Sequence, residues 1–151
     1  MTSIRPSEVR GRILRDHEAL RRHLDELATV IHALRDGDES AVGHAVSLCE
    51  QILKELSRHL DLEDAVLAPT LRELDAWGPI RAERLLRHHV QQREQLGAIA
   101  EKSHAEHTPA ALAVVLADLV EDLRADMAYE ERDVLSPELL RDDLSTSGEG
   151  G

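Results

Sequence analysis

The sequence predicts an all-α protein, an antiparallel up-down-up-down four-helix bundle, and three observations carry this prediction. Long segments show apolar residues alternating three and four positions apart, which is the seam pattern of packed helices. Aromatic residues make up only 1% of the 151 residues, whereas a β-sheet core normally draws on them. Charged residues reach 32% beside 42% apolar residues, with few Gly and Pro, which is typical of a folded helical chain.

Proline and glycine divide the chain into four such segments. The Asp36-Gly37 and Gly78-Pro79 pairs interrupt the periodicity, and Thr108-Pro109 reads as an N-cap followed by proline at the first helical position. We expect helices over about 7–35, 39–74, 80–106 and 109–140, in one domain that spans residues 1–143. The small and polar residues 144–151 are predicted to form a flexible tail.

The charge balance excludes several classes of partner. Lys and Arg number 18 against 30 Asp and Glu, so the net charge is −12. Nucleic acids and anionic membrane surfaces both favour a basic patch, so we expect neither as a partner. Cys49 is the single cysteine and the chain begins with no apolar signal, so a cytoplasmic monomer or homodimer is expected.

Histidine and glutamate interrupt the apolar stripes at five positions. Each position should be apolar by its spacing; the five residues are His17, His59, Glu63, His89 and Glu131. A buried carboxylate is unfavourable unless it is paired or bound to a cation, and no Lys or Arg lies in the stripes beside these residues. A metal ion is therefore the simplest neutraliser.

An internal two-helix repeat supports a metal site. An offset of 72 residues superposes His17 on His89, and an offset of 68 superposes Glu63 on Glu131. Each half then offers a His from one helix and a Glu from the next, which is the pattern of a two-metal carboxylate site inside a bundle. Imidazole and carboxylate ligands suit iron, manganese or zinc better than calcium or magnesium.

The order His17, His59-x-x-x-Glu63, His89 and Glu131 resembles the hemerythrin-like HHE cation-binding family, whose motif is H…HxxxE…H…HxxxE. The resemblance covers about residues 10–140. It implies a pair of non-heme irons, bridged by the two Glu and by an oxygen species. It also implies a small-molecule partner: members bind, sense or react with O₂, nitric oxide, peroxide or iron itself.

One motif position differs, because Met127 stands where the family has a sixth ligand, a His. A thioether is a poor ligand for ferric iron, so the second metal, next to His89, would lose a nitrogen. It could keep an open position, take a substitute from Asp126, Tyr129 or Glu130, or bind weakly. A one-residue twist of the helix would present Asp126 and Glu130 in place of Met127 and Glu131.

The expected function is that of a diiron protein that binds or senses a small oxidant or iron, with turnover of peroxide or nitric oxide as a further hypothesis. The departure at Met127 argues most against reversible O₂ carriage. Two other classes stay open. One is a mononuclear or structural metal-binding bundle, with zinc or manganese as the metal. The other is a metal-free helical interaction module, for which Glu63→Gln and Glu131→Gln would be neutral or stabilising.

Overall fold

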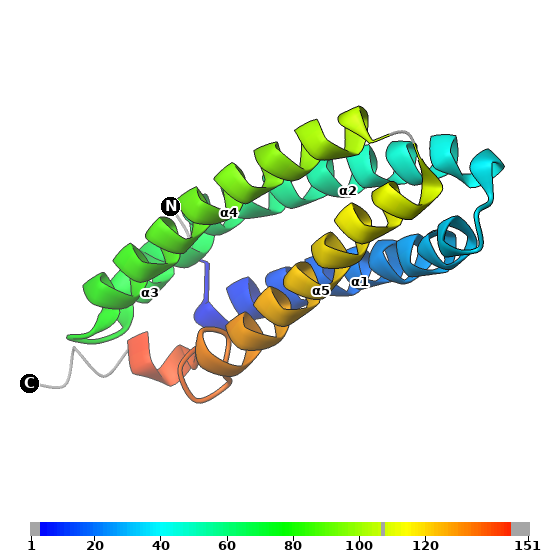
Figure 1. The fold of residues 1–151 in the computed structure, drawn as a ribbon. Helices are drawn as coiled ribbons and strands as arrows, with labels where there is room; N and C mark the ends of the chain where they lie inside the picture. Colours follow the sequence, from blue (N-terminus) through cyan, green and yellow to red (C-terminus); the bar gives the residue numbers. More distant parts are fainter. Residues whose placement is uncertain (1–3, 107, 146–151) are drawn as a thin grey trace, which may run out of the picture.

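The computed structural model of the chain describes residues 4–106 and 108–145, and it contains no β-strand within them. The prediction of an all-α protein is thereby confirmed. The helices are α1 (Pro6–Arg35), η1 (Glu39–Ala41), α2 (Val42–Leu62), η2 (Glu63–Leu67), α3 (Ala68–Leu74), α4 (Gly78–Ala105), α5 (Pro109–Asp133) and η3 (Asp142–Ser145) (Figure 1). The last of these includes the start of the predicted tail, and residues 146–151 lie outside the described part of the chain.

The long helices form a bundle in which α1 packs along α2 and α5, and α4 packs along α2, α3 and α5. Each buries most of the stripe that the sequence predicts, because residues three and four apart share one face of a helix; Leu96 and Ile99 on α4 are only partly buried. None of the helices in the described residues is long and apolar enough to cross a membrane.

The second predicted helix is continuous, but it contains a π-helical turn, η2. In this turn the amide of Ala68 donates to the carbonyl of Glu63, five residues earlier. Pro69 gives the reason, since its ring lacks an N–H and crowds the carbonyl four residues before it. A wider turn relieves that crowding, and such turns are frequent at functional sites. Glu63 is the first residue of the wide turn.

The fourth helix ends earlier than expected. It stops at Asp133, whereas the periodicity predicts a helix to about Leu140. The residue before a proline is driven away from helical geometry, so Pro137 disfavours continuation through Ser136. The chain instead turns back against α1, where the Arg10 side chain donates to the carbonyl of Leu135 at 2.6 Å.

A polar layer divides the core into two apolar clusters. On one side are the leucines of α1, α2 and α5, with Met127 among them. On the other side are Val9, Ile13, the leucines of α3 and Leu135. Within α1 the buried His17 lies between Ile13 and Leu20 in the stripe, so the polar layer crosses the bundle where the two clusters meet.

The turn before α4 depends on Gly78. A Cβ atom at this position would lie 2.1 Å from the carbonyl oxygen of Leu71 and 2.7 Å from that of Arg72. Backbone atoms cannot move aside as a flexible side chain can, so we expect Gly78→Ala to destabilise the fold by about 3 kcal/mol. That loss lowers the melting temperature by roughly 6–12 °C in a chain of this size.

Gly97→Ala is the matched control for this prediction. Gly97 lies on the same helix, and a Cβ there meets nothing within 4 Å. Alanine favours a helix over glycine by about 0.8–1.0 kcal/mol, so this variant should melt slightly higher than the wild type. Thermal unfolding followed by circular dichroism compares the two, and equal melting temperatures would contradict the proposed close contact at Gly78.

Candidate metal centre

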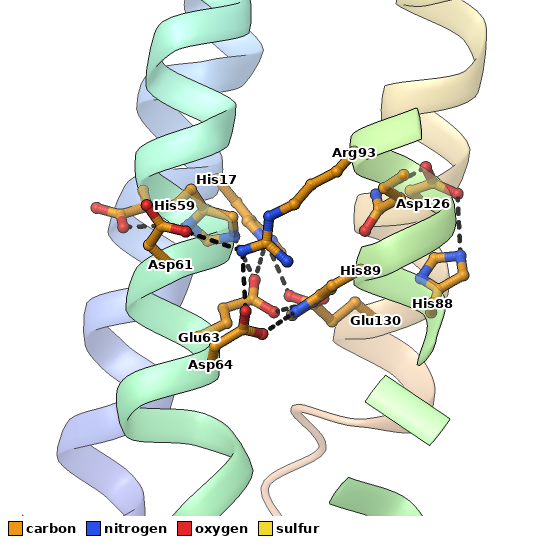
Figure 2. A network of polar contacts seen from close by, with 12 residues as sticks. His17, His59, Asp61, Glu63, Asp64, His88, His89, Arg93, Asp126 and Glu130 are labelled. Atoms are coloured by element: carbon orange, nitrogen blue, oxygen red, sulfur yellow. Dashed lines mark hydrogen bonds and ion pairs between the residues drawn. The ribbon is translucent and has the colours of Figure 1, made fainter. Parts of the chain in front are cut away.

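The polar layer brings together donor side chains from five helical elements (Figure 2). His17 comes from α1, His59 from the last turn of α2, His89 from α4, Glu63 from the start of η2, and Glu130 from the last turn of α5. The three imidazoles and Glu63 are buried, and Glu63 is 0% exposed. Glu130 is nearly buried, with 13% of its side chain exposed.

The carboxylate of Glu63 is the centre of this cluster. Its Oε1 contacts Nε2 of His59 and lies 4.0 Å from Nε2 of His17. Its Oε2 lies 3.1 Å from Nε2 of His89, on the other side. The two oxygens of one carboxylate therefore face imidazoles from different helices, which is the arrangement that a bridging carboxylate requires.

Glu130 completes a set of four donors. Its Oε1 lies 3.1 Å from Nε2 of His17. One donor atom from each of His17, His59, Glu63 and Glu130 lies within 4.8 Å of the others. Two imidazole nitrogens and two carboxylate oxygens in a buried layer are a donor set that suits iron, manganese or zinc.

The hydrogen bonding of the cluster fits a cation. Within the described residues, Oε1 of Glu63 and Oε1 of Glu130 are buried and have no hydrogen-bond partner of acceptable geometry. Buried carboxylate oxygens without a partner are rare and unfavourable. A metal ion held between them would satisfy both oxygens.

Two of the three imidazoles are also hydrogen-bonded from outside the cluster, and the third, His17, has a carboxylate nearby. Nδ1 of His59 is hydrogen-bonded to Oδ2 of Asp16 at 3.2 Å, and Nδ1 of His89 to Oδ1 of Asp64 at 2.5 Å. Nδ1 of His17 lies 3.3 Å from Oε2 of Glu131. Carboxylates in this position fix the orientation of a metal-binding imidazole and leave its Nε2 free for the metal.

Two of these outer carboxylates are themselves held by arginine. Arg93 donates to Oδ2 of Asp64 at 2.8 Å, and Arg21 is paired with Glu131. The Arg21 guanidinium lowers the pKa of Glu131, so this carboxylate stays ionised. The sequence offered no arginine within the stripes, but Arg21 reaches Glu131 from the neighbouring face of α1.

The pKa values show how closely the charges are coupled. Burial and the negative charge of Glu63 together raise the pKa of Glu130 to about 7. Burial opposes the ionisation of Glu63 as well, but its hydrogen bonds with His59 and His89 lower its pKa. For His59 burial acts in the opposite direction, and the contact with Glu63 still raises the pKa to about 9. The ionisation of Glu130 is therefore opposed by its burial and by the neighbouring charge of Glu63.

The structure places the five predicted ligands in two groups. His17, His59, Glu63 and His89 meet in the centre, whereas Glu131 is 26% exposed, pairs with Arg21 and lies near the cluster only at the outer nitrogen of His17. Its neighbour Glu130 points inward instead. Glu130 and Glu131 follow Met127 by three and four residues, so both lie near the buried face of α5, one on each side of its middle.

The three residues named as substitutes for the missing His behave differently. Glu130 joins the cluster, Tyr129 is 53% exposed, and Asp126 accepts a hydrogen bond from Gln92 on α4. Met127 itself lies in the apolar core. The sequence predicts Glu131 as the ligand and Glu130 only as a substitute; the acidic residue next to the predicted ligand was the signal for Glu130.

Comparison with known families agrees with this geometry. The hemerythrin HHE cation-binding domain matches residues 10–137, which is most of the chain. The chain belongs to the hemerythrin HHE family. No curated protein and no solved structure matches it. As a hemerythrin HHE domain, the chain is a cation-binding protein, and the cluster of His17, His59, Glu63 and Glu130 is the candidate for its cation.

Proposed function

We propose that this hemerythrin HHE protein is a non-heme iron protein that binds or senses a small molecule such as O₂, nitric oxide or peroxide. The observation that carries the proposal is the buried set of four donors within 4.8 Å, in which two carboxylate oxygens face imidazoles but form no hydrogen bond of acceptable geometry. An antiparallel up-down-up-down order of the helices would bring the two halves of the repeat to this one layer.

The donors suggest two unequal metal positions. His17, His59, Glu63 and Glu130 would hold the first metal. His89 and Oε2 of Glu63 would hold the second, where Met127 gives no nitrogen. We therefore propose that the first position binds tightly and the second weakly. Iron, when bound, supplies redox chemistry and open coordination positions for a small ligand.

Metal analysis of the anaerobically reconstituted protein tests the proposal, together with an optical spectrum of the oxidised form. We expect at least one iron per chain and near-ultraviolet bands that change on addition of nitric oxide or peroxide. Absence of any bound metal would overturn the proposal and favour the metal-free interaction module.

A structural metal site is the second candidate. The observation in its favour is that four protein donors can already satisfy one metal, as in closed structural sites. It predicts a single tightly held ion, a large loss of melting temperature on chelation, and a spectrum that no small ligand changes.

The carboxylates that contact the outer nitrogens of the imidazoles give a further testable prediction. Asp64→Asn keeps an oxygen near Nδ1 of His89 but removes the charge, so we expect metal at that position to bind about 10–100-fold more weakly. Asp61→Asn is the matched control, because Asp61 accepts from the same Arg93 at 2.9 Å but holds no imidazole. Competition with a chelator measures both, and equal affinities would contradict the role of Asp64.

A further inference from the structure

Two spaces lie beside the donor cluster. An outer cleft of about 550 Å³ lies between α4 and α5, and Arg84, His88 and Tyr129 are among the residues that line it. An inner cavity lies between the donors and the apolar core, and the centre of a water-sized molecule can occupy about 20 Å³ of it. A single water needs roughly 10–15 Å³ of such space, so the cavity holds a molecule of one or two heavy atoms.

Two hydrogen-bonded side chains lie at the boundary between these spaces. Nε2 of Gln92 on α4 donates to Oδ2 of Asp126 on α5 at 3.0 Å. Gln92, Asp126 and Glu130 line both the outer cleft and the inner cavity. Gln92 is 7% exposed, so its side chain fills the boundary and does not extend into solvent. Figure 2 shows Asp126 on the α5 side of the centre, beside His88 and away from His59.

We propose that the α4–α5 cleft is the entrance through which a small uncharged molecule reaches the metal centre, and that Gln92 and Asp126 form the partition it must pass. This inference rests on the proposed function and deepens it by naming the route and the class of ligand. Rotation of the Gln92 side chain breaks one neutral-to-charged hydrogen bond and joins the two spaces without moving a helix.

The lining of the route selects against charge. The inner cavity is walled by Leu20, Leu24, Leu56, Leu60, Leu123 and Met127. An anion entering it would lose its water and pass two carboxylates, those of Asp126 and Glu130. The outer cleft carries arginines of α4 and also the carboxylates of Asp126, Glu130 and Asp133, so a charged molecule of either sign meets like charges there. O₂, nitric oxide and hydrogen peroxide carry no charge and meet neither barrier.

A second hollow reaches the site from the opposite side, between α1 and α2. It is lined by Asp16, Ala19, Glu55 and Arg58, and the His59 ring forms its inner wall. That ring is fixed by Asp16 on one nitrogen and contacts Glu63 through the other. Opening this side would require a proposed metal ligand to move, so the partition at Gln92 is the easier path.

Nitric oxide binding to the ferrous protein tests the proposal, measured by stopped flow for wild type, Gln92→Ala and Gln95→Ala. Gln95 is an exposed glutamine of the same helix that lines neither space, so it is the matched control. Loss of a partition bond worth about 1 kcal/mol raises the rate about fivefold. We expect Gln92→Ala to raise both the association and the dissociation rate, with the dissociation constant unchanged.

Three further results complete the test. A bulky residue at the rival hollow, in Ala19→Trp, should leave the rates unchanged, and a slower rate there would assign the entrance to α1 and α2. Equal rates for Gln92→Ala and Gln95→Ala, with iron still bound, would overturn the route alone, whereas a protein without iron overturns the proposed function as well. Crystals of the metal-free protein under xenon should show xenon against the apolar side of the inner cavity, where its leucines and Met127 lie, and an empty cavity would count against the route.

Discussion

Glu63→Gln is expected to abolish metal binding. Glu63 is the central donor of the cluster, fully buried, and each of its oxygens faces an imidazole. Glutamine keeps the shape but loses the negative charge, and its NH₂ group cannot bind a cation. Metal at about 100 times its dissociation constant stabilises the wild type by about 2.7 kcal/mol. Chelation should therefore lower the wild-type melting temperature by roughly 5–11 °C and leave that of the variant unchanged.

Glu55→Gln is the matched control, because it removes a similar contact outside the centre. Glu55 also lies on α2, and its Oε2 lies 2.7 Å from Nδ1 of His23. This variant should keep the metal content and the chelator response of the wild type. The response to chelator is the informative measurement, because Glu63 also pairs with imidazoles in the metal-free protein. A Glu63→Gln variant that still binds metal would show that the centre lies elsewhere.

Much of this centre could be predicted because buried polar residues leave a clear mark in a helical stripe. His17, His59, Glu63 and His89 stand where packing demands an apolar side chain, and the structure brings all four together. The same periodicity predicts the all-helical fold, since each stripe must be buried against another. Whether these four residues bind a metal stays a prediction for the experiments above.

The remaining features depend on small rotations of a helix about its own axis, which the spacing of residues in the sequence does not determine. Spacing and the internal repeat select Glu131, whereas the packing of α5 against α1 turns Glu130 inward and pairs Glu131 with Arg21. The wide turn at Glu63 and the early end of α5 both follow from prolines, Pro69 and Pro137. A proline predicts a disturbance of the helix, but neighbouring packing decides whether the helix widens or stops.

Met127→His is expected to convert a weak second metal position into a strong one. Met127 is buried, lies one turn before Glu130 and lines the inner cavity together with His59 and Glu63. An imidazole there adds a nitrogen donor beside the Glu63 carboxylate, whereas a thioether binds ferric iron poorly. Iron titration followed by metal analysis should show the content rise from about one to two per chain, a change in stoichiometry that no effect on packing would produce.

Met127→Leu is the control that distinguishes the effect of a new metal ligand from that of a changed side chain in the core. Leucine conserves size and typically changes core stability by less than about 1.5 kcal/mol. This variant should bind iron as the wild type does. If histidine and leucine at position 127 gave the same iron content, the second position would need more than this one ligand. The departure of this chain from its family would then lie in the orientation of α5, which turns Glu130 toward His17 and leaves Glu131 with Arg21.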